Sequence, residues 1–167
     1  MKDGNWQWSV ASDSTVVHAL IKASDRRSAT EFAPAPHRNV ARTSHLVAAG
    51  AVQLLDIDGR PAATITLVEM APFELKGIPF DKVERPVYMQ RFSVDDWAIM
   101  RFGALPAIAT LRRAREIAGQ MGGEALRCEI NPDIVTVRTL LSSFGFHEVG
   151  KRSGHPARAY MQHSLVL

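Results

Sequence analysis

The stretch that most constrains the fold is residues 123–150, GEALRCEINPDIVTVRTLLSSFGFHEVG. Strand-forming residues run from Leu126 to Ile130, and Asn131-Pro132-Asp133 then breaks the strand. This triplet can open a helix, because proline suits the first helical turn and Asn or Asp can cap free amides. Apolar side chains from Ile134 to Phe144 recur at helical spacing, and Gly145 favours a left-handed helix end before a return strand. We therefore expect two strands that splay around a helix, and ligands bind at such openings in α/β sheets.

Capping and periodicity signals predict the other elements of the chain. We expect helices from Ser12 or Asp13 to Arg26, Asn39 to Ala49 and Pro106 to Met121, and strands at Val52–Ile57, Ala62–Glu69, Val87–Val94 and Ala159–Leu165. Asp58-Gly59 between the first two of these strands is a strong hairpin signal. Residues 70–86 hold three prolines and a glycine and predict a long loop over the site, whereas residues 95–105 are expected to be irregular or a single short turn. The order α-α-β-β-β-α-β-α-β-β predicts an α/β (α+β) protein with a mixed sheet.

Length and composition favour one domain spanning residues 1–167. Hydrophobic residues make up 46% of the chain and charged residues 22%, as is usual for soluble globular proteins. The chain has no apolar run of roughly 18 residues and no apolar signal core at its start, so we expect a cytoplasmic protein without a membrane partner. Net charge is only +3, which is a weak signal for nucleic acid, and we expect no nucleic-acid partner. No His, Asp or Glu grouping has the spacing of a metal site, so no metal is expected.

The element order and the segment NPDIVTVRTLLSSFGF together resemble the GNAT superfamily of N-acetyltransferases. In that family the late helix follows an Asn-containing turn and closes on Gly-Phe, which Asn131, Leu140 and Gly145-Phe146 match. The segment YMQRFSV, Tyr88–Val94, is similar to the family's central strand, and the likeness extends from Trp8 to Leu165. Within the superfamily the chain is most similar to uncharacterised actinobacterial members that carry a segment like RNVARTSHLVAAGAVQLL. The resemblance implies a mixed, mostly antiparallel sheet with a central splayed parallel strand pair and helices on both faces.

The resemblance also implies a reaction and a cosubstrate. The expected function is transfer of acetyl from acetyl-CoA, or of another acyl group from its CoA ester, to a primary amine of a small molecule or protein, by direct attack in a ternary complex. The implied cofactor-binding residues are Phe92, Ser93 and Val94 on the central strand, Arg101, Phe102, Gly103, Ala104, Leu105 and Ala107 at the pyrophosphate loop, and Asn131 and Leu140 near the late helix. Backbone amides at a helix N-terminus suit a pyrophosphate, because the free donors and the helix dipole both favour anions.

The chain departs from the family pattern at two places. The pyrophosphate loop usually reads Arg/Gln-x-x-Gly-x-Gly/Ala, but RFGALPA lacks the second glycine, and Pro106 removes an amide donor for which Arg101 could compensate. The tyrosine that usually protonates the leaving thiolate is replaced by Leu141. Ser142 and Ser143 are the nearby hydroxyls, although their helical phase differs from that of Leu141, and Ser143 is the candidate acid. These departures keep an alternative open, a catalytically silent GNAT-fold binding or interaction module with a degenerate cofactor loop.

Several polar residues have both a catalytic and an ordinary interpretation. Glu69 ends a hairpin strand where several family members place a general base, but it also fits a solvated strand end. Asp95 and Asp96 could orient an amine or cap the following turn, and His45 could border the acceptor or lie on the surface. Cys128 is the only cysteine and is expected to pack as a small apolar residue.

The exposed edges of a mixed sheet also suggest a homodimer.

Overall fold

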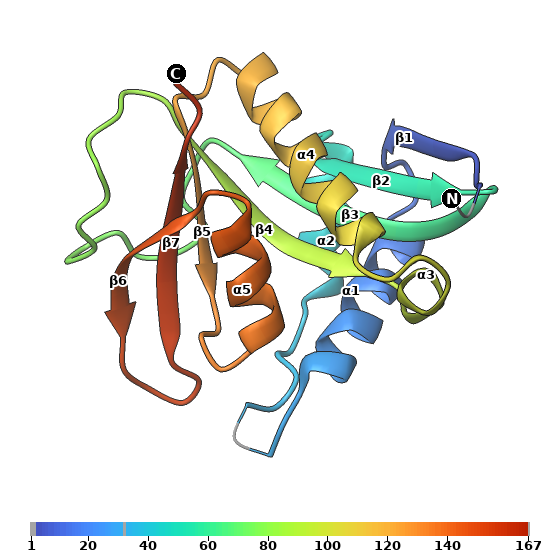
Figure 1. Ribbon diagram of the computed structural model, residues 1–167, viewed down its shortest axis with the longest axis horizontal. Helices are drawn as coiled ribbons and strands as arrows, with labels where there is room; N and C mark the ends of the chain where they lie inside the picture. The colour runs from blue at the N-terminus through green and yellow to red at the C-terminus, as the bar shows by residue number, and fades with distance from the viewer. Residues whose placement is uncertain (1–2, 32, 167) are drawn as a thin grey trace. The chain divides into compact units, whose positions relative to one another are not determined.

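A mixed seven-stranded sheet forms the frame of the protein, in the order β1-β2-β3-β4-β5-β7-β6 (Figure 1). The computed structural model describes residues 3–31 and 33–166. The strands are β1 Trp6–Val10, β2 Val52–Ile57, β3 Arg60–Val68, β4 Pro86–Val94, β5 Ala125–Ile130, β6 His147–Arg152 and β7 Arg158–Ser164. The helices are α1 Ser14–Ser28, α2 Val40–Ala48, α3 Asp96–Phe102, α4 Leu105–Gln120 and α5 Val135–Ser143. β4 and β5 pair in parallel, whereas β1–β2, β2–β3, β5–β7 and β6–β7 are antiparallel, which confirms the predicted class of mixed, mostly antiparallel sheet.

The chain divides into two compact units. The first unit holds residues 1–30, 34–66 and 91–112, and the second holds residues 31–33, 67–90 and 113–167. Strands β3 and β4 and helix α4 each contribute residues to both units. The expectation of a single domain stays a prediction. Within the described ranges, none of the helices has the length and apolar character needed to cross a bilayer.

The helix caps and the hairpin turn of the first unit form as the sequence predicts. The Asp13 carboxylate caps α1 by accepting hydrogen bonds from the amides of Thr15 (2.9 Å) and Val16 (3.3 Å), and the Asn39 side chain caps α2. The hairpin between β2 and β3 turns at Asp58 and Gly59, whose φ values of 54° and 74° are both left-handed, as a two-residue type I′ turn requires.

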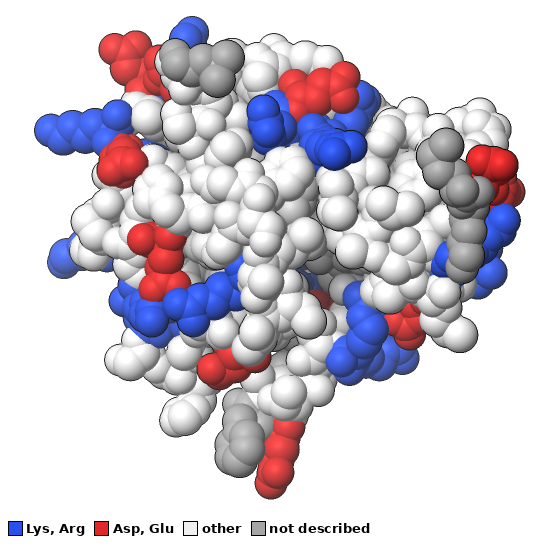
Figure 2. Space-filling model, viewed as in Figure 1, with Lys and Arg blue, Asp and Glu red and all other residues white. Residues whose placement is uncertain are grey.

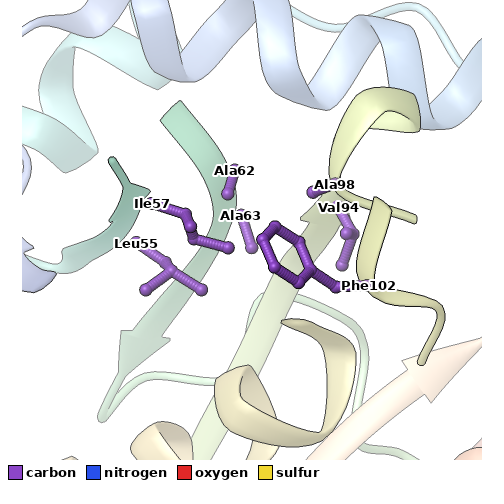
Figure 3. Close-up of a cluster of buried hydrophobic side chains, with 7 residues drawn as sticks. All are labelled: Leu55, Ile57, Ala62, Ala63, Val94, Ala98 and Phe102. Carbon is purple, nitrogen blue, oxygen red and sulfur yellow. The ribbon is translucent and has the colours of Figure 1, made fainter. Parts of the chain in front are cut away.

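An apolar cluster in the first unit holds α3 against the hairpin (Figure 3). It consists of Leu55 and Ile57 from β2, Ala62 and Ala63 from β3, Val94 from β4, and Ala98 and Phe102 from α3. The expectation that residues 95–105 are irregular or a single short turn was wrong. Asp95 caps α3 through the amide of Trp97, and Ala98 and Phe102 lie four positions apart, so one helix face fits the cluster. The indole of Trp97 also donates a 2.9 Å hydrogen bond to the carbonyl of Pro61.

Strand β1 was not predicted. It pairs with β2 from Trp6↔Ile57 to Val10↔Gln53, and it exposes or half-exposes all five of its side chains. The sequence WQWSV does alternate between apolar and polar residues, but the run is only five residues long and none of its side chains is buried.

The second unit corrects the prediction that β5 and β6 splay around α5. Strand β7 lies between them and pairs with β5 over its whole length, from Ala125↔Ser164 to Ile130↔Ala159. The parallel pairing of β4 with β5 is short, because it stops at Tyr88↔Arg127 although both strands continue. The helix also begins later than its capping residues, because the Asn131 side chain accepts from the amide of Asp133 and stabilises a turn instead.

The long loop between β3 and β4 is held to the second unit by its own side chains. Phe73 and Phe80 pack against Tyr88 of β4 and Tyr160 of β7, with ring centroids 5.2–6.3 Å apart. The buried Arg127 guanidinium donates to the loop carbonyl of Asp81 at 2.6 Å. Residues 70–85 therefore form the predicted loop, and its contacts are those of a fixed segment.

Candidate functional site

The middle of β4 contains a residue in a left-handed conformation. Arg91 has a φ of 54°, which is rare for a residue with a long side chain and interrupts the regular alternation of a strand. Its guanidinium donates a 2.7 Å hydrogen bond to the hydroxyl of the buried Thr43 on α2. No property of the segment YMQRFSV indicates this conformation, so the sequence did not identify Arg91 as a candidate site residue.

Gln90, directly before Arg91, carries an unsatisfied donor. Within residues 3–31 and 33–166 its amide nitrogen is buried without a hydrogen-bond partner. In the second unit, Met89 and Gln90 follow Tyr88, the last residue of β4 that pairs with β5. Polar groups on this part of the strand therefore lie where the parallel ladder has ended, and such buried groups normally require a partner.

The end of β4 is fixed within the first unit. Ser93 and Val94 are buried, and Phe92 is partly buried against the cluster of Figure 3. The carbonyl of Val94 accepts a 2.9 Å hydrogen bond from Arg27 at the end of α1. The assignment of Phe92, Ser93 and Val94 to the cofactor stays a prediction.

The junction between α3 and α4 places a helix N-terminus soon after β4. Gly103 adopts φ 64° and ψ −132°, a conformation that only glycine takes readily, and its amide donates to the carbonyl of Ile99 at 2.8 Å. Helix α4 starts at Leu105, and Ile108 makes the first helical bond, to the carbonyl of Ala104. The first-turn amides of Ala104, Leu105 and Ala107 need partners outside the helix, whereas Pro106 has no N–H. A 16-residue helix therefore offers amide donors and the positive end of its dipole.

Two of the loop residues have their side chains engaged elsewhere. Arg101 forms an ion pair with Asp58 at the hairpin turn, with 3.4 Å between Nη1 and Oδ2, and its guanidinium lies 5.0 Å from the ring centre of Phe102. The side chain of Phe102 is buried in the apolar cluster. Phe102 can therefore contact a ligand only through its backbone. That the charge of Arg101 compensates for the amide donor lost at Pro106 stays a prediction.

The second unit holds the remaining candidates. Asn131 accepts the turn bond already described, Leu140 is half-buried, and Glu69 is exposed just beyond β3. The hydroxyl of Ser143 donates to the carbonyl of Thr139 at 2.8 Å, so its proton is bound to its own helix. A shallow groove of about 430 Å³ along loop residues 75–84 is lined by none of these candidates in the described chain.

The fold of the chain matches known structures. No family model matches the sequence, and no curated protein sequence does. Among solved structures, a GNAT-family acetyltransferase from Listeria monocytogenes has a TM-score of 0.74 at 16% identity, with 95% of this chain and 94% of that chain covered. One from Streptococcus agalactiae has a TM-score of 0.72 at 15% identity, with 95% of each chain covered. A protein from Salmonella typhimurium, solved with its cofactor acetyl-CoA, has a TM-score of 0.69 at 14% identity, with 98% of this chain and 95% of that chain covered. The chain has the GNAT fold.

Within the GNAT fold, the ordinary interpretation is confirmed for Asp95 and Cys128. Asp95 caps α3. Asp96 does not cap the helix but forms an ion pair with Arg27. Cys128 is buried, and burial together with the neighbouring Glu129 charge raises the pKa of its thiol to about 12. A thiol that stays protonated packs as a small apolar group and is a poor nucleophile.

Other predictions on this GNAT-fold chain stay open. His45 is exposed on α2, which tests neither of its interpretations. In the part of the chain that the structure describes, no three His, Cys, Asp or Glu side chains gather as metal ligands. The closer likeness to actinobacterial members stays a prediction.

Proposed function

We propose that the protein is an acyl-CoA-dependent N-acyltransferase that transfers acetyl from acetyl-CoA to a primary amine of a small molecule or protein. The observation that carries the proposal is the α4 N-terminus behind Gly103, which follows the central strand in a chain with the GNAT fold. The solved relative with acetyl-CoA supports the choice of cosubstrate.

The first-turn amides of α4 would hold the pyrophosphate of the cosubstrate. Gly103 turns the chain, and α4 begins directly after it. The N–H donors are therefore those of Ala104, Leu105 and Ala107, although the usual glycine spacing is absent. Past Tyr88, β4 has left its parallel partner, so its backbone can bind the pantetheine arm, together with Phe92, Ser93 and Val94. The thioester supplies an activated acyl group, and no metal is needed.

Proton transfer in this proposal depends little on side chains. Leu141 is 1% exposed in the core and cannot donate, and the Ser143 proton is bound to the carbonyl of Thr139. Glu69 is exposed and is retained as the candidate base, with Ser143 as the candidate acid. Water can protonate a CoA thiolate, and an amine that is already neutral needs no base, so direct attack in a ternary complex remains feasible.

A charge-matched pair of variants tests the pyrophosphate site. Gly103→Asp and Gly103→Asn impose the same strain at φ 64°, but only Asp brings a negative charge to the α4 N-terminus. We expect Gly103→Asp to weaken acetyl-CoA binding about tenfold more than Gly103→Asn, measured by isothermal titration calorimetry. Equal affinities of the two variants, or no acetyl-CoA binding by the wild type, would contradict the proposal.

The silent binding module is the second candidate. It is favoured by Pro106 in the cofactor loop and by the buried Leu141. Release of CoA above the uncatalysed rate with any amine of a broad panel would exclude it.

The partner predictions are proposals as well. We propose an amine acceptor, a homodimer through a sheet edge, a cytoplasmic location, and no nucleic-acid or membrane partner. On the face shown in Figure 2, Lys and Arg lie beside Asp and Glu in several places, which is unlike a continuous basic surface for a phosphate backbone.

A further inference from the structure

An arginine and a histidine of the first unit meet at one buried hydroxyl. Thr43 on α2 is 1% exposed, and its Oγ1 lies 2.7 Å from Nη1 of Arg91 and 2.9 Å from Nδ1 of His18 on α1. Three elements far apart in sequence, α1, α2 and the second half of β4, thus meet at one polar point.

Positive charge exceeds negative charge around this point. Arg38 is matched by Asp25 through hydrogen bonds of 2.6 Å and 2.9 Å. Burial, followed by the charges of Arg38 and Arg42, lowers the pKa of Arg91, whereas Asp25 acts in the opposite direction.

His18 experiences the same positive environment. Burial is the largest cause that lowers its pKa, followed by the charges of Lys22, Arg91, Arg38 and His37. The imidazole is therefore held in its neutral form beside a group of cations.

Arg91 lacks the partner that its charge would require. Its guanidinium has five N–H donors and is half-buried, yet its hydrogen bond is to a neutral hydroxyl. Across residues 3–31 and 33–166, no carboxylate forms an ion pair with Arg91. A partly buried cation without an anion is unfavourable, and the left-handed φ of 54° at the same residue adds backbone strain. Unfavourable terms concentrated at one residue are typical of functional sites.

We propose that the acceptor amine also carries a carboxylate, and that this carboxylate binds Arg91 beside Thr43 and Arg38. The proposal rests on the proposed function and narrows its acceptor to amino acids and similar small acids. An arginine fork binds a carboxylate through two parallel hydrogen bonds, and the Arg91 side chain is already oriented by Thr43. Arg38 is fixed by Asp25, and the exposed Arg42 and Lys22 add long-range attraction for an anion.

Binding of simple anions tests the site without acetyl-CoA. Succinate, glutarate and inorganic phosphate are titrated into the wild type, Arg91→Gln, Arg91→Lys and Arg26→Gln, with calorimetry and thermal melting as readouts. Arg26 is the matched control, because it is an exposed arginine in the last turn of α1. We expect a dicarboxylate to bind the wild type and Arg26→Gln, with affinity reduced about tenfold or more in Arg91→Gln and partly restored in Arg91→Lys. Equal binding to wild type and Arg91→Gln, or stronger binding of phosphate than of carboxylates, overturns the proposal.

Assays of CoA release test the carboxylate site separately from the proposed acyltransferase function. CoA release is measured with matched acceptors, glycine against glycinamide, L-alanine against L-alaninamide and 4-aminobutyrate against 4-aminobutanamide. We expect the acid of a pair to have the lower KM, and that preference to vanish in Arg91→Gln while the Kd for acetyl-CoA is unchanged. Equal use of acids and amides by an enzyme that binds acetyl-CoA overturns the carboxylate site and leaves the acyltransferase intact. Anion binding that depends on Arg91, in a protein that does not bind acetyl-CoA, supports the site and overturns the proposed function.

Discussion

Gly123 lies directly against Val87, because a Cβ added to Gly123 would stand 2.7 Å from Cγ2 of Val87 and 2.8 Å from the carbonyl oxygen of Ala118. Gly123 lies in the connection from α4 to β5, and Val87 is the middle one of the three β4 residues that pair in parallel with β5. Both neighbours belong to the second unit, so the close approach is a local packing requirement.

Gly123→Ala is expected to destabilise the protein by about 1–3 kcal/mol, the usual cost of overpacking a rigid site. The matched control is Gly119→Ala in α4, where an added Cβ meets nothing within 4 Å. That change should stabilise by about 0.5–1 kcal/mol, because alanine is the better helix former. Urea unfolding of both variants measures the difference, and equal midpoints would contradict the prediction.

The conformation of Arg91 predicts a difference between two neutral replacements. Arg91→Asn and Arg91→Val both remove the charge, but Asn tolerates a left-handed φ of 54° and the β-branched Val does not. We expect Arg91→Val to be less stable than Arg91→Asn by about 1–3 kcal/mol in chemical denaturation. A Val variant as stable as the Asn variant would show that the strand relaxes to an ordinary pleat.

His18 predicts a dependence of stability on pH. Its pKa in the folded protein lies below the ordinary value of 6.5, because burial and the neighbouring cations disfavour the imidazolium. The unfolded chain therefore takes up a proton more readily, so the contribution of His18 is complete above pH 6.5 and is lost as the pH falls below it. His18→Gln should flatten the decline of the melting temperature between about pH 7.5 and about pH 5.5, whereas His45→Gln at an exposed site should not. Identical pH profiles of the wild type and His18→Gln would contradict this.

The contacts of Arg127 predict that this residue anchors the long loop between β3 and β4. Its guanidinium donates to Gln162, to the hydroxyl of Tyr88 and to the carbonyl of Asp81, and it lies 4.5 Å from the ring centre of Phe80. Arg127→Met leaves several buried partners unsatisfied and should cost about 2–4 kcal/mol. Hydrogen exchange should show the largest loss of protection in residues 73–84, and Lys82→Met, at an exposed loop position, should show none. Loss of protection spread evenly over the chain would contradict a specific role in the loop.

Local signals in the sequence predicted most elements because the residues involved act on their own neighbours. Asp13 and Asn39 cap the helices that follow them, and Asp58-Gly59 turns the hairpin without help from distant residues. The GNAT fold was expected because the order of these elements, together with Asn131 and Gly145, resembles the pattern of that family.

Features that depend on distant contacts were not predictable in the same way. The insertion of β7 between β5 and β6 is a property of the whole sheet, and α3 needs the hairpin to receive Ala98 and Phe102. In the candidate site, the position of Gly103 could be inferred, but the pairing of Arg101 with Asp58 and of Arg91 with Thr43 could not. Both pairs join segments that only the folded chain brings together.

The contacts of the long loop also limit how new variants of this protein could arise. Arg152 on β6 donates to the loop carbonyl of Lys76, and a side chain at Gly150 would come within 3.2 Å of the Pro79 ring. A change in the loop would therefore require matching changes at positions 127, 150 and 152 of the sheet. A loop transplanted from another protein would not pack against the sheet unless these three strand positions were exchanged with it.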